Sequence, residues 1–256
     1  MKKGLVSIIM PTYNCGKFIA ETLDSIKAQT YENWEIIIVD DCSKDNTKEI
    51  VDEYIAQDAR IKYHCLETNS GAAVARTEAM KRAEGEYMAF CDSDDLWMED
   101  KLEKQLAFMN ENSYAFSCTA YEQIDEESNS LNRVIKTVKK TDYNRLLLDC
   151  PVGNSSVMYN VEKMGKFEVP NIRKRNDDAL WLTMLKKEDE SGKRFCIYGM
   201  SDVLMRYRIR KNSISSNKFA VIKYHWILYR DIEHLSVIRS AFHIGYWCFL
   251  KVFKIK

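Results

Sequence analysis

Acidic residues gather in two groups, each at the point where an apolar run of the sequence ends. The Asp40-Asp41 pair follows one run, and Asp92-Ser93-Asp94-Asp95 follows another. The carboxyl ends of the strands in an open α/β sheet meet at one crevice, so both groups are expected to face the same ligand. Residues two apart in an extended segment point to one side. Asp92 and Asp94 are therefore candidates for holding Mn²⁺ or Mg²⁺ together with substrate phosphates.

A second acidic pair, Asp177 and Asp178, opens a predicted helix directly after the cationic run from Arg173 to Arg175. One carboxylate at a helix start is ordinary, because the helix dipole favours negative charge there. Two carboxylates leave one free for proton transfer.

A dense cationic segment, Arg206 to Lys211, ends a predicted strand, and Asn212 and Ser213 follow it. Arginine forks match phosphate oxygens, so a diphosphate is the expected ligand of this segment. Each group taken by itself also has a structural interpretation. Asp92 and Asp95 are suited to capping a helix at Leu96, and the arginines are suited to a solvated loop.

The elements that must position these groups alternate between short apolar runs and amphipathic stretches, as in βαβ units. Strands are predicted at Leu5–Thr12, Glu35–Val39, Ile61–Leu66, Glu86–Cys91, Ala115–Ala120, Ser155–Tyr159 and Val203–Ile209. Helices are predicted at Lys17–Gln29, Asn46–Gln57, Ala72–Ala83, Glu99–Asn112, Asp177–Lys187, Lys218–His234 and Ser236–Phe253, with Asp45-x-Thr47 and Ser70-Gly71 suited to capping. The pattern predicts an α/β protein with a mostly parallel central sheet.

Composition excludes several classes of protein. The chain has 38 basic and 38 acidic residues, so no net charge argues for a nucleic-acid partner. Its eight cysteines include no C-x-x-C pair, which favours reduced thiols and a cytoplasmic location. No apolar run approaches the roughly 20 residues needed to span a bilayer. Glycine-rich dinucleotide and P-loop motifs and the G-x-S-x-G motif are also absent.

Taken in order, the motifs resemble those of the family-2 glycosyltransferases with the GT-A fold. Val6 to Asn14 looks like the opening strand of that family, and Glu35 to Ser43 looks like its second strand. Asn69 to Arg76 is similar to a segment that helps hold the nucleotide. By this resemblance the nucleotide-binding residues are Pro11, Tyr13, Asn14, Asp41, Arg76, Asp92 and Ser93.

The resemblance also assigns roles to the acidic residues. Asp92-Ser93-Asp94-Asp95 matches the D-x-D motif, which implies that Asp92 contacts the ribose and the metal and that Asp94 ligates the metal. Asp177 and Asp178 take the place of the catalytic acidic pair, whose second member, Asp178, would be the general base. Many members carry Tyr-Arg-x-His where this chain has Tyr207-Arg208-Ile209-Arg210. Arg208 and Arg210 are then candidate diphosphate ligands, and Arg210 cannot ligate a metal as histidine can.

The resemblance is strongest to bacterial enzymes that build teichuronic acid, capsule or other surface polysaccharides. It implies a transfer with inversion. The processive branch of the family carries a Gln-x-x-Arg-Trp motif, and because this chain has none, the resemblance implies non-processive transfer of one sugar. The expected donor is a UDP-sugar and the expected acceptor a glycan or an undecaprenyl-type lipid-linked glycan. A sugar nucleotidyltransferase and a non-catalytic nucleotide-sugar-binding scaffold subunit remain as alternatives.

The last part of the chain is expected to form an extension, with a catalytic domain over residues 1–213 and a helical extension over 214–256. From Lys218 onward the extension has seven Lys or Arg residues against two acids, interleaved with aromatic residues. This composition suits peripheral contact with the inner face of the cell membrane, and packing on the core or a homodimer contact is the alternative. Acceptor choice is expected to depend on this extension and on the segment from Asp125 to Val157.

Overall fold

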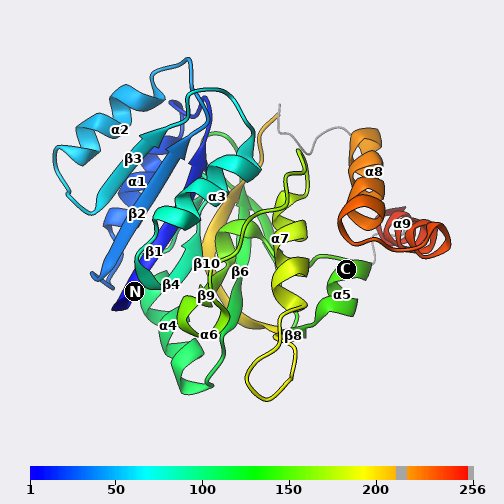
Figure 1. Cartoon of the computed structure of the whole chain (residues 1–256). Coiled ribbons are helices and arrows are strands. Elements are labelled where there is room, and N and C mark those ends of the chain that lie inside the picture. Colours follow the sequence, from blue (N-terminus) through cyan, green and yellow to red (C-terminus); the bar gives the residue numbers. More distant parts are fainter. Residues whose placement is uncertain (212–217, 253–256) are drawn as a thin grey trace.

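The structure, a computed structural model, describes residues 1–211 and 218–252 of the chain. Within these ranges one ten-stranded sheet has the order β3-β2-β1-β4-β9-β6-β10-β5, with β7 paired to β6 and β8 paired to β10. Helices flank it on both faces (Figure 1). The strands are β1 (Lys2–Thr12), β2 (Trp34–Asp40), β3 (Ile61–Cys65), β4 (Gly85–Phe90), β5 (Leu96–Trp97), β6 (Phe116–Ile124), β7 (Ser130–Ile135), β8 (Lys140–Thr141), β9 (Met158–Asn160) and β10 (Ile197–Arg208).

Neighbouring residues of the central strands face opposite layers of helices, as the pleat of a strand requires. Ile8 and Met10 of β1 pack in one hydrophobic core with α1, α2 and α4, whereas Ile9 packs in the other with α3, α5 and α7. The helical elements are α1 (Ile19–Lys27), α2 (Thr47–Ile55), α3 (Ala72–Arg82), α4 (Lys101–Glu111), α5 (Tyr143–Leu148), η1 (Asn154–Ser156), α6 (Val161–Met164), α7 (Asn176–Leu185), α8 (Lys218–Ile227), η2 (Leu228–Ile232) and α9 (Val237–Val252).

The four strands β3, β2, β1 and β4 pair in parallel, which confirms the prediction for the first half of the chain. The sheet beyond them is mixed, because β9 runs antiparallel to both β4 and β6. The strand predicted from Ser155 begins only at Met158, and the polar residues before it form η1. Strands β5, β7 and β8 were not predicted, since two of them have only two residues and β7 is largely exposed.

Capping at the two predicted helix starts has different origins. The Asp45 carboxylate accepts a hydrogen bond from the Thr47 backbone N–H at 3.1 Å, as expected from the local sequence. At the start of α3 no side chain of Ser70 or Gly71 caps the helix. The Asp41 carboxylate, at the end of β2, accepts from both backbone N–H groups instead. Gly71 has φ +92°, a conformation that favours glycine.

The segment from Asp125 to Asp149 contains the tip of the β6–β7 hairpin, β7, β8 and α5. The Asp125 carboxylate accepts from the backbone N–H groups of Glu127 and Asn129, which closes the hairpin tip. Ser128 at this tip donates to the Glu21 carboxylate of α1 at 2.6 Å. The hairpin is therefore tied to the first helix of the fold.

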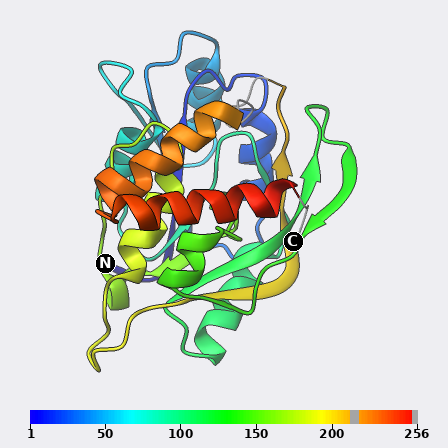
Figure 2. The same ribbon diagram turned by 90° about the vertical axis from the view of Figure 1, so that its right-hand side faces the viewer.

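The C-terminal helices lie against α5 and α7, and α9 crosses the molecule on the face seen in Figure 2. Leu228, Tyr229 and Leu235 belong to the same hydrophobic core as Trp181 of α7. Tyr229 also donates to the Leu147 carbonyl at 2.9 Å. The expected boundary between residues 213 and 214 and the predicted helix end at Phe253 lie outside the described residues. In the described chain no helix has the length and apolarity needed to cross a membrane.

Candidate active site

The D-x-D segment is a tight turn at the carboxyl end of β4. The Asp95 N–H donates to the Asp92 carbonyl at 3.1 Å, and the chain then enters the short strand β5. The expectation of an extended segment was therefore wrong, and so was the alternative of a helix starting at Leu96. The carboxylates are brought together by the turn, which the hydrogen bond between Asp92 and Asp95 closes, and not by the alternation of side chains along an extended strand.

Asp95 fastens this turn to the rest of the fold. One carboxylate oxygen accepts from the Arg208 backbone N–H at 2.9 Å, and the other accepts from the Ser155 hydroxyl at 2.5 Å. The side chain is buried, and burial raises its pKa well above the ordinary value, with the charges of Asp94 and Asp92 adding to the effect. Both oxygens are thus used by the protein, so Asp95 has a structural role.

Asp92 is held by residues from two other parts of the chain. Its Oδ1 accepts from Arg76 Nη2 at 3.1 Å and from Asn154 Nδ2 at 2.8 Å. Arg76 donates its other terminal nitrogen to Asn176, at the start of α7. Burial, with the charges of Asp94 and Asp177, raises the pKa of Asp92 although Arg76 opposes the rise. Arg76 therefore joins the D-x-D turn to the helix that carries Asp177 and Asp178.

Asp94 faces a different arginine. Its Oδ2 accepts from Arg210 Nη1 at 3.0 Å, and its backbone carbonyl accepts from Arg208 Nε at 2.7 Å. The Asp94 and Arg210 side chains are 21% and 35% exposed, so solvent and ligands can reach this pair. The Asp92 side chain is 33% exposed, so Asp92 and Asp94 are the two carboxylates of the turn that a ligand can reach.

The donor set at the turn fits a divalent ion that shares its coordination with a ligand. Within residues 1–211 and 218–252 no group of three or more His, Cys, Asp and Glu residues is arranged to hold a metal. Asp92 and Asp94 each offer one carboxylate oxygen for which the described chain provides no hydrogen bond. Mg²⁺ and Mn²⁺ accept such hard oxygen ligands and fill their remaining positions with water and phosphate oxygens.

Arg208 does not take the position expected of a diphosphate ligand. Its guanidinium is fully buried and donates to the Asp94 carbonyl, the Glu21 carboxylate and three acceptors of the hairpin tip. No donor of the fork is directed at an open crevice. The expectation for Arg208 was wrong, because its fork ties the turn to the hairpin and to α1. Arg210 is the arginine of this strand end that remains for a phosphate.

The residues expected around the nucleotide base lie at the carboxyl ends of β1 and β2. Pro11 is buried in the sheet, whereas Tyr13 and Asn14 are exposed beyond its edge. Asn14 has a positive φ of 47°, donates its N–H to the Ser43 hydroxyl and accepts from the Lys44 N–H. This crosslink fixes the β1 end against the β2 end and leaves the Tyr13 ring 47% exposed.

Asp41 and Ser93, also expected to bind the nucleotide, are mostly buried. The Asp41 carboxylate is 4% exposed and receives the two N–H groups at the start of α3, which leaves only its remaining lone pairs for a ligand. Ser93 is 7% exposed, and its carbonyl accepts from the Thr22 hydroxyl at 3.1 Å.

A pocket of about 290 Å³ lies beside Ser70 and Gly71, between the start of α3 and residues 171–173.

Asp177 and Asp178 occupy the first turn of α7 in different environments. Asp178 is 6% exposed and pairs with Arg175 Nη2 at 2.5 Å. Burial raises the pKa of Asp178 to about 6, with Arg175 opposing and Asp177 adding to the rise. Asp177 is less buried and lies near enough to Asp92 to raise its pKa. Arg76 therefore lies between the D-x-D turn and the start of the helix that carries the Asp177-Asp178 pair.

Several site residues were missed by sequence reasoning. Asn154 and Ser155 support Asp92 and Asp95 from a position some 60 residues away in the sequence. Arg175 was noted only as part of a cationic run, and its role was missed: it lies in the left-handed region at φ 61° and supplies the ion pair of Asp178. For Asn154 and Ser155 the only signal was the Gly153-Asn154-Ser155-Ser156 run, whose small polar residues directly precede an apolar strand.

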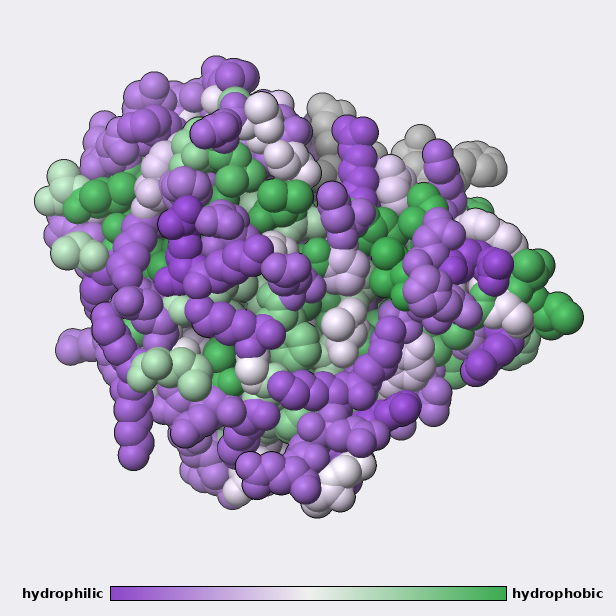
Figure 3. All heavy atoms as spheres, viewed as in Figure 1, coloured by the Kyte–Doolittle hydropathy of each residue, from purple (hydrophilic) through white to green (hydrophobic). Residues whose placement is uncertain are grey.

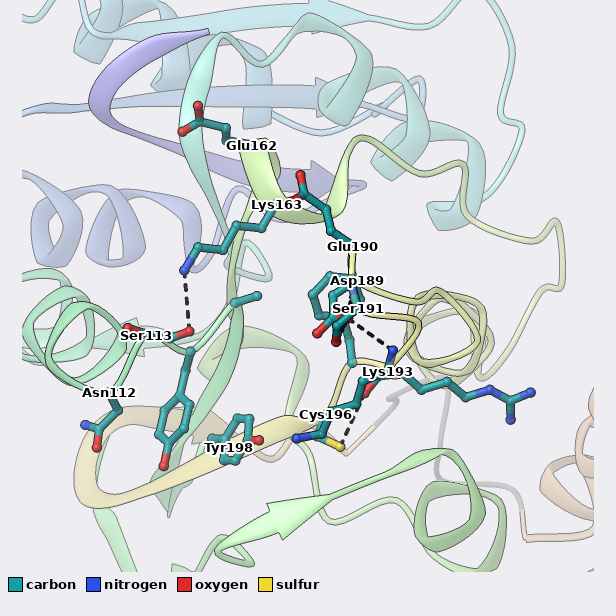
Figure 4. Close-up of a pocket in the computed structure, with 14 residues that line it drawn as sticks. Asn112, Ser113, Glu162, Lys163, Asp189, Glu190, Ser191, Lys193, Cys196 and Tyr198 are labelled. Carbon is teal, nitrogen blue, oxygen red and sulfur yellow. Dashed lines mark hydrogen bonds between the residues drawn. The ribbon is translucent and has the colours of Figure 1, made fainter.

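A larger pocket, of about 670 Å³, lies elsewhere (Figure 4). Tyr114 and Tyr198, whose rings stack at 3.6 Å, line it together with Lys163 and Asp189. It opens where β6 and β10 begin, and these strands run parallel to β4. The pocket is therefore at the opposite edge of the sheet from the acidic turn.

Comparison with known proteins identifies the family. The model of the family described as glycosyl transferase family 2 matches residues 7–171. The putative teichuronic acid biosynthesis glycosyltransferase TuaG of Bacillus subtilis is 44% identical over 252 residues, covering 98% of this chain and 96% of the relative. The Escherichia coli UDP-Glc:alpha-D-GlcNAc-diphosphoundecaprenol beta-1,3-glucosyltransferase WfgD is 37% identical, covering 96% of this chain and 93% of the relative.

Two solved structures share the fold at low sequence identity. S. aureus TarS 1–349 in complex with UDP-GlcNAc has a TM-score of 0.66 and 22% identity, over 93% of this chain and 70% of that one. This chain spans 41% of the longer TarS structure. The mannosyltransferase PcManGT from Pyrobaculum calidifontis, in complex with GDP-Man and Mn²⁺, has a TM-score of 0.64 and 19% identity, over 90% of this chain and 64% of that one. The chain therefore belongs to glycosyltransferase family 2, with the GT-A fold, and is a transferase.

Proposed function

We propose that this protein transfers one sugar from a UDP-sugar, with inversion, to a hydroxyl of a lipid-linked glycan in the synthesis of a bacterial surface polysaccharide. The observation that carries the proposal is the Arg76 bridge. It joins Asp92, in the turn suited to phosphate and metal, to Asn176 beside the Asp177-Asp178 pair. The name of the TuaG relative supports the polysaccharide class, and that of WfgD supports a UDP-sugar donor and a diphosphoundecaprenol-linked acceptor.

In the proposed reaction Asp178 accepts the proton of the acceptor hydroxyl as its oxygen attacks the anomeric carbon of the donor sugar. The bond from that carbon to the diphosphate breaks on the opposite side, so the configuration inverts. Arg210 contacts the departing diphosphate. A divalent ion bound at Asp92 and Asp94 would supply further positive charge to the diphosphate.

The remaining expected residues hold the nucleoside. We place the base against the exposed Tyr13 ring and beside Asn14, with the free lone pairs of Asp41 as acceptors. Pro11 and Ser93 shape the ends of the strands that border it. Arg76 acts mainly by orienting Asp92, because both of its terminal nitrogens already have protein acceptors.

A thermal-shift screen tests this function, since a ligand that binds only the native state raises the melting temperature. With Mn²⁺ present, UDP and UDP-sugars are expected to raise the melting temperature more than nucleoside diphosphates and nucleotide sugars with other bases. Incubation with the best donor should release nucleoside diphosphate. Release of pyrophosphate would indicate a sugar nucleotidyltransferase instead, and binding with no turnover on any acceptor or water would indicate a scaffold subunit.

We also propose that the 214–256 extension rests on an anionic membrane surface. On α9, Ile238 is 82% exposed and Phe242 is 62% exposed, and with Gly245 they follow helical spacing along one face. The helix contains no acidic residue, and Arg239 beside the face is exposed. Green spheres gather at the edge of Figure 3 where Figure 1 places α9. In a two-fold symmetric dimer formed through this face, the positive charges of the two copies of α9 would repel each other, whereas the anionic headgroups of a membrane would attract them.

Flotation with phosphatidylglycerol vesicles tests the membrane contact. The full chain is expected to float, and the double substitution Ile238→Glu and Phe242→Glu is expected to abolish flotation. The matched control is Leu131→Glu with Val134→Glu, which places the same charges on exposed apolar residues of β7 and should leave flotation intact. A dimer that becomes monomeric in the α9 variant, with no flotation of the wild type, would assign the face to a second copy.

A further inference from the structure

The Arg210 side chain is held in a fixed position against the D-x-D turn. Its guanidinium donates to Asp94 Oδ2 at 3.0 Å and lies 4.9 Å from the centroid of the Phe18 ring. Phe18 is 5% exposed and precedes α1, so the ring is a fixed surface. An arginine over an aromatic face gains a cation–π contact in addition to its ion pair. The side chain is thus placed on Asp94 before any ligand arrives.

Asp94 is the carboxylate of the turn that Arg210 contacts. Asp95 is used by Ser155 and the Arg208 N–H, and Asp92 is held by Arg76 and Asn154. For the Asp94 carboxylate, Arg210 is the one side-chain partner in the described chain. A metal approaching Asp94 alone therefore meets a guanidinium cation already bound to the same group.

The charges of Asp94, Arg210 and a divalent ion favour two alternative arrangements, in which the Asp94 carboxylate is bound either by the guanidinium or by the metal. A divalent ion next to the guanidinium is repelled, and the two compete for the same carboxylate. A diphosphate changes both conditions, because its oxygens accept the arginine fork and also provide ligands for the metal. When Arg210 turns from Asp94 to the diphosphate, the carboxylate becomes available at the moment the phosphate ligands arrive.

We propose that Arg210 makes metal binding at Asp94 conditional on the nucleotide diphosphate, so that the protein without donor excludes the metal and the two ligands bind with strong positive coupling. The inference rests on the proposed function, since it requires a nucleoside diphosphate at this site. It assigns Arg210 a second role besides contact with the leaving group. The histidine that many family members carry at this position could not act in this way, because it can ligate the metal itself.

Titration of the full-length protein with Mn²⁺, followed by the electron paramagnetic resonance signal of free Mn²⁺, tests the coupling. Saturating UDP is expected to increase the affinity for Mn²⁺ by at least about tenfold. Because linkage is reciprocal, Mn²⁺ should increase the affinity for UDP, measured by calorimetry, by the same factor. Equal affinity for Mn²⁺ with and without UDP would overturn the inference.

Substitutions of Arg210 provide the sharper test, because they are read in the absence of nucleotide. Arg210→Ala and Arg210→His are both expected to bind Mn²⁺ alone at least about fivefold more tightly than the wild type. Lys211→Ala is the matched control, since it removes one positive charge from the neighbouring exposed residue and should leave the affinity unchanged. Asp94→Ala should bind Mn²⁺ weakly in either condition.

The outcomes separate this inference from the proposed function. Normal binding of UDP, with the same affinity for Mn²⁺ in Arg210→Ala as in the wild type, would overturn the inference alone. Failure of every nucleoside diphosphate to bind, with or without Mn²⁺, would overturn the proposed function and the inference with it. Circular dichroism checks that each variant is folded, and if Arg210→Ala is not, Arg210→His decides the question.

Discussion

Replacing Asp178 with asparagine is expected to lower the rate of sugar transfer by about 10²–10⁴-fold, the contribution typical of a positioned general base. The amide keeps the size of the side chain but cannot accept the proton of the acceptor hydroxyl. Nucleotide affinity should be unchanged, because Asp178 pairs with Arg175 and not with the D-x-D turn. Single-turnover transfer and calorimetric titration with UDP measure the two effects separately.

The pH dependence of the wild type follows from the same residue. A general base must be deprotonated, and burial raises the pKa of Asp178 to about 6. The value of kcat/KM is therefore expected to rise with pH up to about 6 and to level off above it. Loss of this rise in Asp178→Asn, measured on its residual activity, would tie the titration to Asp178.

Asp177→Asn is the comparator for this prediction. Both substitutions remove one carboxylate from the first turn of α7, but Asp177 is the less buried of the two and lies toward Asp92. We expect Asp177→Asn to lose less activity than Asp178→Asn. A larger loss in Asp177→Asn, or unchanged turnover in Asp178→Asn, would remove Asp178 from the role of base.

The strands that carry the site could be predicted because their sequences are apolar on both faces. Val6 to Met10 and Ile36 to Val39 are buried throughout, and the short length of these runs and their β-branched residues favour central strands over buried helices. Polar residues follow where each run leaves the sheet. The positions of Asp41 and Asp92 at one edge were therefore predictable from the ends of the runs.

The internal geometry of the site could not be predicted in the same way, because it depends on contacts between distant residues. Ser155 and Asn154 hold the D-x-D turn, but nothing near Asp92 in the sequence identifies them. The same limit explains the error at Arg208. An arginine fork fits backbone carbonyls as well as phosphate oxygens, and only the position of the β6–β7 hairpin decides between them.

Arg208→Ala is expected to reduce the free energy of unfolding by about 3 kcal/mol, the lower end of the range for removing one partner of a buried charged group. The Arg208 side chain has 0% exposure, and its loss would remove the donor of the Asp94 and Glu126 carbonyls and one of the two donors of the Asp125 carbonyl. Urea unfolding followed by circular dichroism, with no ligand present, measures the change.

The matched control is Arg206→Ala, the same substitution two residues earlier in β10. The Arg206 side chain is 41% exposed and approaches Glu122 at 3.4 Å, a surface ion pair for which about 0.5 kcal/mol or less is expected. If Arg208 were instead a diphosphate ligand, Arg208→Ala would match Arg206→Ala in stability and would lose affinity only for UDP. Because Arg208 holds the Asp94 carbonyl, a loosened turn should also weaken UDP binding, but only together with the loss of stability. The two variants in urea therefore separate an arginine that builds the site from one that binds the substrate.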